Sequence, residues 1–176
     1  MANIFGGVTM IKGLGHAAFN VKDMEKTIAF YEETIGFKKA FDIPRPENGE
    51  PWIVYMYGGG GQFIELFYGA TKENLYREEN IGFFHICVAV DDIQEAWKKI
   101  VETGAPQDDA PKQGADFNWQ CWTHDPDGNQ IVILCRQYSS FSGFVSSSIQ
   151  MSTSLCTFTS KMGMAKPKSI LKQQKL

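Results

Sequence analysis

Hydrophobic positions in residues 11–136 follow the same order twice: an alternating stretch, a helical stretch and further extended stretches. Residues 13–24, GLGHAAFNVKDM, match residues 82–93, GFFHICVAVDDI, in one register. Alternation indicates a strand, and an aspartate that precedes apolar residues spaced by three or four is typical of a helix N-cap. Each half of this region is therefore predicted to start with a strand that leads into a helix.

Both predicted helices start at an aspartate and end at a glycine. In the first half, apolar residues at helical spacing run from Asp23 to Gly36, and in the second half they run from Asp92 to Gly104. A glycine after the last apolar position can adopt the left-handed conformation that ends many helices. The two helices are thus bounded by ordinary local signals.

Extended segments follow each helix, separated by the turn sequences RPENGEP, GGGG and DPDGN. The pattern predicts strands at residues 39–43, 52–57 and 62–68 in the first half, and near Ala105, at 118–122 and at 130–135 in the second. Each half is therefore predicted to be a βαβββ unit. Its helix covers one face of the sheet and leaves the opposite face for a ligand.

Side-chain alternation assigns three chemically interesting residues to those free faces. In the first strand the apolar row runs from Ala17 to Val21, so His16 points away from the helix, and His85 is placed in the same way in the second half. Glu65 is isolated in the apolar strand QFIELFY. A single histidine in a strand is usually a core residue whose ring nitrogens are hydrogen-bonded within the protein. Two histidines at equivalent positions, together with a carboxylate in an apolar strand, suit metal ligation instead. Coordination to a metal ion relieves the free-energy cost of burying the charge of the carboxylate.

Composition narrows the class of protein. The chain has 176 residues, 43% of them hydrophobic, which is enough for a substantial core. Its apolar runs are strand-sized and its start lacks a signal-peptide pattern, so we expect a cytoplasmic protein with no membrane partner. The part of the chain before Gln137 is acidic, which speaks against nucleic acid as a partner. The four cysteines have no Cys-x-x-Cys spacing, which favours buried free thiols.

A change of composition marks the end of the repeated region. All 20 acidic residues precede Gln137, whereas the Ser/Thr-rich segment after it contains five lysines. Such a composition cannot offset chain entropy, so the tail is predicted to be disordered. The predicted divisions are an N-terminal extension, 1–10; a body, 11–136, with modules 11–80 and 81–136; and a tail, 137–176.

The repeated stretches, together with QFIELFYG and NWQCWTHDPDGNQI, resemble the vicinal oxygen chelate superfamily, and glyoxalase I-like (lactoylglutathione lyase-like) proteins in particular. The resemblance covers residues 11–134. It implies an α+β fold in which two βαβββ modules form a half-open β-barrel, commonly in a homodimer. It also implies a metal-dependent lyase that binds one divalent ion, Zn, Ni, Fe or Mn, and acts on a small-molecule substrate.

The same resemblance carries His16, Glu65 and His85 over as metal ligands, with Glu65 also catalytic. It places a fourth ligand at Val132, and the next residues are also apolar, so no shift of the alignment supplies a carboxylate. In glyoxalase I-like enzymes this carboxylate both binds the metal and moves a proton. The resemblance therefore implies an impaired lyase, with water, or Gln130 as a substitute ligand, in the open position.

Two further positions, Glu33 and Gly69, stand where glutathione-dependent members carry a basic residue and an asparagine, which speaks against glutathione as the thiol. Three functions stay open: a glyoxalase I-like lyase or isomerase, a metal-poor binding or resistance protein of the same fold, and an Fe(II)-dependent dioxygenase. A reading-frame change near codon 132 would explain both Val132 and the unmatched tail. Ordinary divergence is the alternative.

Overall fold

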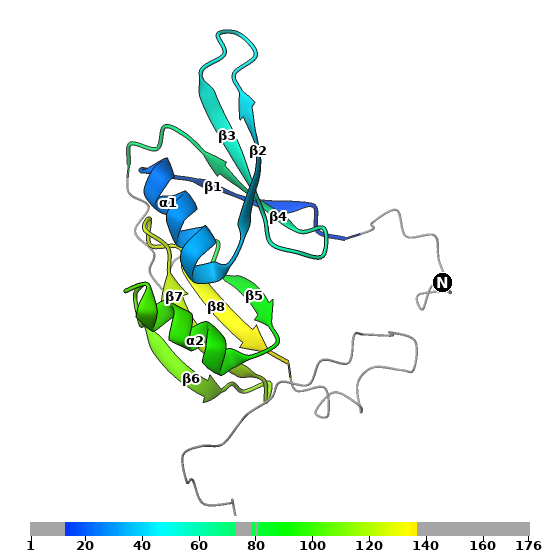
Figure 1. Cartoon of the computed structure of the whole chain (residues 1–176), viewed down its shortest axis with the longest axis vertical. Helices are drawn as coiled ribbons and strands as arrows, with labels where there is room; N and C mark the ends of the chain where they lie inside the picture. Colours follow the sequence, from blue (N-terminus) through cyan, green and yellow to red (C-terminus); the bar gives the residue numbers. More distant parts are fainter. Residues whose placement is uncertain (1–12, 73–78, 80, 137–176) are drawn as a thin grey trace, which may run out of the picture.

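The computed structural model describes residues 13–72, 79 and 81–136, which form two units of the same topology (Figure 1). The first contains β1 (His16–Asn20), α1 (Met24–Phe30), the π-helical turn η1 (Tyr31–Ile35), β2 (Lys38–Pro44), β3 (Pro51–Tyr57) and β4 (Phe63–Phe67). The second contains β5 (Ile86–Val90), α2 (Ile93–Glu102), β6 (Asp109–Gln113), β7 (Trp119–His124) and β8 (Gln130–Cys135). The predicted α+β fold of two βαβββ units is confirmed.

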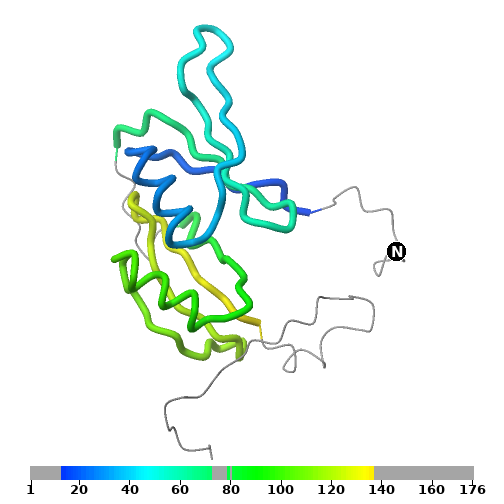
Figure 2. Tube along the Cα trace, viewed as in Figure 1, coloured from blue at the N-terminus to red at the C-terminus, as the bar shows by residue number. Residues whose placement is uncertain are grey.

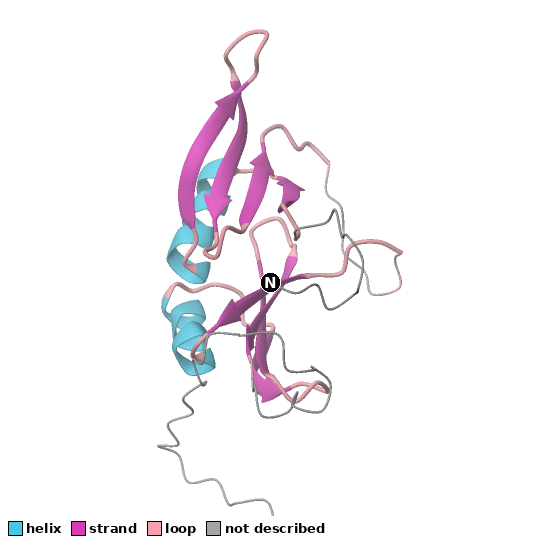
Figure 3. Cartoon of the chain, turned by 90° about the vertical axis from the view of Figure 1, so that its right-hand side faces the viewer, coloured by secondary structure: helices cyan, strands magenta, loops and turns pink. Residues whose placement is uncertain are grey.

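The two sheets have the same strand order, β1-β4-β3-β2 and β5-β8-β7-β6. In each sheet the first strand runs parallel to the last strand of its unit, and the other pairs are antiparallel. Both helices lie on the same side of the two sheets (Figure 3). The opposite face of each sheet therefore carries no helix of the described chain. In the part of the chain that the structure describes, the two sheets are separate and form no closed barrel.

Both helices begin and end where the sequence predicts. The side chain of Asp23 accepts a hydrogen bond from a backbone N–H in the first turn of α1, and Asp92 does the same for α2. Gly36 and Gly104 follow the helical segments with φ of 89° and 69°, in the left-handed region that favours glycine. These caps satisfy backbone groups that a helix end leaves unpaired.

One hydrophobic core extends through both units. Tyr31 and Leu66 of the first unit and Ile100 and Ile131 of the second are almost fully buried and belong to the same cluster. The helix α2 contacts η1, so the helical sides of the two units meet. This packing fixes one face of each sheet toward the core and leaves the other free.

Some expectations need correction. The strand expected near Ala105 lies at Asp109–Gln113, because Ala105 follows the helix end and is itself buried in the core. The strand β5 starts one residue after His85. The thiol of Cys121 is free and buried as predicted, whereas Cys87 is free but exposed and Cys135 is disulfide-bonded.

The predicted N-terminal extension and the predicted disordered tail lie outside the described residues. No helix in the described part of the chain has the length and apolar character needed to cross a membrane.

Candidate functional site

The turn sequence DPDGN, between β7 and β8, holds the second unit against the first. The side chain of Asp127 accepts hydrogen bonds from the backbone N–H of Lys22, at 3.0 Å, and from the hydroxyl of Thr27, at 3.2 Å. Figure 2 shows this turn, in yellow, beside the blue helical segment. A motif that sequence alone identifies as a turn therefore also sets the relative placement of the two sheets.

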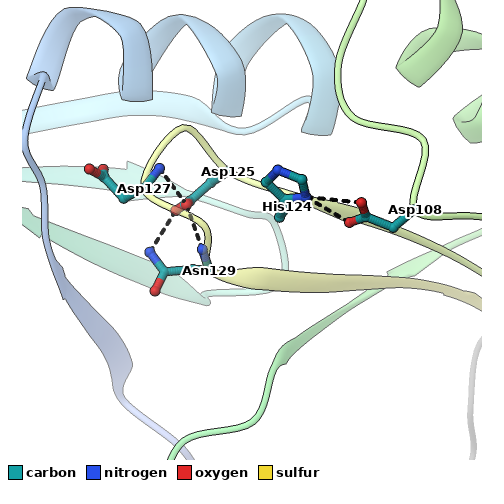
Figure 4. A network of polar contacts seen from close by, with 5 residues as sticks. All are labelled: Asp108, His124, Asp125, Asp127 and Asn129. Carbon is teal, nitrogen blue, oxygen red and sulfur yellow. Dashed lines mark hydrogen bonds and ion pairs between the residues drawn. The ribbon is translucent and has the colours of Figure 1, made fainter. Parts of the chain in front are cut away.

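Asp125, in the same turn, is buried beneath this contact. It accepts a hydrogen bond from the hydroxyl of Tyr31 at 3.2 Å, and it also accepts from the side chain and backbone of Asn129 and the backbone of Asp127 (Figure 4). Burial raises the pKa of Asp125 and, more strongly, the pKa of Tyr31. This network joins the two units through a carboxyl group removed from water.

On the free face of the first sheet, His16 and Glu65 lie together. Nε2 of His16 is 3.3 Å from Oε2 of Glu65, and the other carboxylate oxygen accepts a hydrogen bond from the hydroxyl of Tyr55. Glu65 is only 6% exposed, whereas the side chain of His16 is about half exposed. The histidine and the carboxylate thus form a pair that is open to solvent on the histidine side.

Tyr55 is a residue of this site that the sequence analysis missed. It lies directly opposite Glu65 in the antiparallel β3–β4 ladder, where paired side chains share a face. Its hydrogen bond to Glu65 is the main cause of a raised pKa of the tyrosine. Side-chain alternation in the sequence could have identified Tyr55. It lies between the apolar residues Val54 and Met56, just as Glu65 lies between two apolar neighbours, so both point to the free face.

Aromatic rings surround this pair. Phe41 stacks on Tyr55 with ring centroids 4.4 Å apart, and Phe63 packs against both Tyr55 and Tyr57. Phe41 is 48% exposed and Tyr57 is 40% exposed, so part of this aromatic surface is open. The free face of the first sheet therefore combines a polar pair with an apolar surface, the composition of many small-molecule sites.

In the second sheet, strand register assigns the counterpart of Glu65 without ambiguity. Glu65 pairs with Ala18 of β1 and with Tyr55 of β3, and Val132 pairs with the equivalent residues Cys87 of β5 and Trp122 of β7. Val132 is 3% exposed. The position that the family resemblance assigns to the fourth ligand is thus the structural equivalent of Glu65, and its side chain has no donor atom.

His85 lies beside Trp122, with ring centroids 5.2 Å apart, and Phe84 contacts both rings. Its buried Nδ1 has no hydrogen-bond partner among the described residues. An unpaired buried nitrogen of this kind costs about 1–3 kcal/mol, so it points to a missing partner. Gln130, the predicted substitute ligand, is half-buried and pairs with His124 at the start of β8.

The structure brings together two of the predicted ligands but not the third. Within the ranges that the structure describes, no group of three or more His, Cys, Asp or Glu side chains is placed to hold a metal ion. His16 and Glu65 fit as two adjacent donors, and the unpaired Nδ1 of His85 fits as a third donor from elsewhere. One chain by itself therefore presents a partial site.

Comparison with known proteins identifies the family of the chain. The sequence model of the Glyoxalase/Bleomycin resistance protein/Dioxygenase superfamily matches residues 13–133. Human mitochondrial methylmalonyl-CoA epimerase is 31% identical over 98 residues, 53% of this chain and 54% of that protein. A probable chloroplastic lactoylglutathione lyase of Arabidopsis thaliana is 29% identical over 127 residues, 69% of this chain and 35% of that protein.

The chain therefore spans about half of the first of these relatives and about a third of the second. A solved structure of a superfamily member from Sphaerobacter thermophilus has 27% identity and a TM-score of 0.58, and the match covers 73% of this chain and 100% of that one. The likeness thus extends through both βαβββ units of the described chain.

Proposed function

The chain belongs to the glyoxalase/bleomycin resistance protein/dioxygenase superfamily, and we propose that it is a metal-dependent lyase or isomerase that moves a proton next to a carbonyl group of a small-molecule thiol derivative. Lactoylglutathione and methylmalonyl-CoA, the compounds in the names of the two relatives, are both thioesters. Proton transfer beside the carbonyl is the chemistry that the two compounds have in common. The proposal extends this chemistry to the chain without naming the thiol.

The observation that carries the proposal is the contact between His16 and Glu65 on the free face of the first sheet. A carboxylate that is 6% exposed is costly to bury unless it has strong partners, and a divalent cation is a suitable one. His16, Glu65 and His85 would hold the ion. When bound, it would polarise a substrate carbonyl as a Lewis acid. Glu65 is the proton-handling carboxylate that the first unit supplies.

We further propose that a second copy of the chain completes the site. His85 stands apart from the His16–Glu65 pair in one chain, yet its Nδ1 lacks a partner. A homodimer that placed the free face of one second sheet on the free face of the partner's first sheet would supply that histidine. It would also cover the exposed rings of Phe41 and Tyr57. Two-fold pairing of this kind makes two equivalent sites.

A mixing experiment tests the shared site directly. His16→Ala and His85→Ala should each lose stoichiometric Zn(II) binding when measured alone by elemental analysis and titration calorimetry. After the two variants are unfolded, mixed and refolded, about half of the dimers are mixed, and each of these has one intact site, so about a quarter of the sites should regain metal. Failure to regain metal, in a mixture shown by mass spectrometry to contain mixed dimers, would contradict the shared site.

A metal-poor binding protein of the same fold is the second candidate. It is favoured by the absence, within the described chain, of a three-donor group, and by the satisfied state of Glu65, which already contacts His16 and Tyr55. The open rings of Phe41 and Tyr57 would then bind an apolar or planar ligand. A folded dimer that retains no Zn(II), Ni(II), Fe(II) or Mn(II) at stoichiometric level would support this function over the first.

A further inference from the structure

We infer that His124, held by Asp108, is the proton-transfer group of the second unit and takes over the role for which Val132 has no donor or acceptor atom. The inference rests on the proposed function and names a residue that the function needs. It starts from a pair of residues outside the proposed metal ligands: the only close contact between a histidine and an aspartate in the described chain.

Strand register places His124 on the same free face as Val132. Trp122 pairs with Val132 and His124 pairs with Gln130 in the antiparallel β7–β8 ladder. The alternate residue of β7, Thr123, is fully buried toward the core, so Trp122 and His124 point the other way. Diagonal neighbours in such a ladder are about 7–8 Å apart, a distance that long or aromatic side chains bridge.

The contact with Asp108 determines which ring nitrogen of His124 is available. Nδ1 lies 2.8 Å and 3.0 Å from the two carboxylate oxygens of Asp108 (Figure 4). A carboxylate at Nδ1 fixes the proton there and leaves Nε2 as an acceptor. Nε2 has no hydrogen-bond partner in the part of the chain that the structure describes. Asp108 is thus a positioning residue, and it leaves the reactive nitrogen uncommitted.

His124 is also accessible. Its side chain is 36% exposed and that of Asp108 is 30% exposed, so a substrate on the free face can reach the ring. Figure 4 shows that the next residue, Asp125, points to a separate set of partners, so the buried network between the units does not involve His124. The histidine–aspartate pair therefore belongs to the free face.

The proposed step balances without another reactant. Nε2 of His124 accepts the proton from the carbon beside the substrate carbonyl. The electron pair of that C–H bond forms a carbon–carbon double bond, and the carbonyl pair moves onto oxygen to give an enolate. Nε2 then gives a proton back to carbon, either the one it accepted or a solvent proton that has replaced it. In an isomerase this proton goes to the former carbonyl carbon, while the hydroxyl proton of the first carbon moves to the oxygen of the second; in an exchange reaction a solvent proton goes to the original carbon. Neutral His124 is regenerated.

The test uses the full chain loaded with Zn(II), in D₂O, and follows loss of the α-proton signal by NMR. Methylmalonyl-CoA and mixtures of methylglyoxal with glutathione, coenzyme A or cysteamine serve as probes. We expect His124→Gln to slow exchange about 10²–10⁴-fold with unchanged metal content. Asp108→Asn should slow it about 10–100-fold, because the ring loses its fixed tautomer. Asp109→Asn is the matched control: that carboxylate pairs with Lys112, so exchange should stay within about twofold.

Nitrogen NMR provides a second readout that needs no substrate. The neutral form of the His124 ring should carry its proton on Nδ1, and Asp108→Asn should shift the population toward the other tautomer. A proton on Nε2 in the wild-type chain overturns the inference, as does equal exchange in His124→Gln and wild type. If the wild-type chain exchanges no probe, the inference and the proposed function fail together, whereas loss of the His124 effect alone leaves the proposed function standing.

Discussion

The first and second units share a backbone plan but differ at the centre of the free face. In the first, the central position of the last strand is Glu65, which contacts Tyr55 and His16. In the second, the same register position is Val132, packed beside Trp122. Both residues are nearly fully buried. Equivalent positions in one fold thus carry a carboxylate with partners in one copy and an apolar side chain in the other.

The difference shows that the fold depends on the helix-facing side of each sheet and places fewer demands on the residues of the free face. The side of each sheet that faces the helix is apolar in both units and belongs to one shared core. The free face contributes little to that core, so a valine there satisfies folding as well as a glutamate with two partners does. A valine in place of a glutamate at this position therefore does not require any rearrangement of the sheet.

Replacing the valine is the most drastic way to remove the difference. In a His124→Gln background, Val132→Glu should raise Zn(II) affinity and increase turnover of methylglyoxal-derived hemithioacetals about 10²–10⁴-fold, because the second unit then regains a group that can bind the metal and move a proton. Calorimetry and steady-state kinetics with several thiols measure the two effects separately. A gain of metal affinity without a gain of turnover would show that the substrate pocket, and not the metal site, prevents lyase activity with these thiols.

Leu134→Glu is the matched control for Val132→Glu. Leu134 lies on the same face of β8, two residues further on, and pairs with Ala89 and Gln120. The control adds the same charge outside the position equivalent to Glu65, so metal affinity should not rise. Equal metal affinity in both variants would show that Val132 does not face the ion.

The two histidines should respond differently to removal. His16→Ala and His85→Ala should each weaken Zn(II) binding more than tenfold, since loss even of a group that supports a metal ligand costs about 10–100-fold. Without metal, however, His16→Ala removes a contact of buried Glu65, whereas His85→Ala removes a nitrogen that has no partner in the described chain. Chemical denaturation of the metal-free variants should therefore show that His16→Ala lowers the free energy of unfolding through the loss of a polar contact, whereas His85→Ala lowers it only through the loss of its ring contacts with Trp122 and Phe84.

Much of the fold could be predicted because its signals are local. Alternation, the aspartates before the helices and the glycines after them depend on residues close in sequence, and the repeat supplied each signal twice. The position of β6 was predicted wrongly because its sequence lacks such local signals. The segment Asp109–Gln113 contains a proline and no apolar alternation, so its pairing with β7 depends on tertiary context.

The candidate site was predictable only in part, since its contacts join separate strands. Alternation placed His16 and Glu65 on a free face, and in the structure Nε2 of His16 lies 3.3 Å from Oε2 of Glu65. It gave no information on which residue lies across the ladder, so Tyr55 and the His124–Asp108 contact were missed. Alternation within each unit also does not determine how the two units are placed relative to one another. The sequence therefore did not predict that His85 lies apart from His16 and Glu65.

The buried carboxyl between the units gives a pH-dependent test of their contact. Because burial raises the pKa of Asp125, the folded chain binds its proton more tightly than the unfolded chain does. Its contribution to stability is fully present below the ordinary aspartate pKa of about 4 and declines as pH rises through the raised pKa.

Asp125→Asn cannot titrate, so the difference in unfolding free energy between wild type and this variant should fall with increasing pH. The difference should be largest at low pH, where the variant should be less stable than wild type by about 1–2 kcal/mol. The amide N–H₂ of the new asparagine cannot accept the hydrogen bond that the side chain of Asn129 donates to Asp125. Urea denaturation across the acid range measures this. The exposed Asp116 bonds only within its own loop, so Asp116→Asn provides a control that should change the free energy of unfolding less than Asp125→Asn does at low pH.

The smallest expected effect concerns the tyrosine across from Glu65. Tyr55→Phe removes the hydroxyl that donates to the carboxylate and keeps the ring that stacks on Phe41, so it should lower the free energy of unfolding by about 1 kcal/mol. Tyr57→Phe, on the same face with no hydrogen bond from its hydroxyl within the described chain, should change it by less than about 0.5 kcal/mol. Equal effects of the two changes would show that the hydroxyl of Tyr55 is not what stabilises Glu65.

Register extends this test to the second unit, where Trp122 takes the place of Tyr55 opposite Val132. A glutamate introduced at position 132 would lack the hydroxyl donor that Glu65 has, so metal-free Val132→Glu should be less stable than wild type. Adding Trp122→Tyr should recover part of that loss, whereas adding Trp122→Phe should not, because only the tyrosine donates a hydrogen bond. If Tyr and Phe at position 122 give the same stability, the two units do not use equivalent positions to support a buried carboxylate.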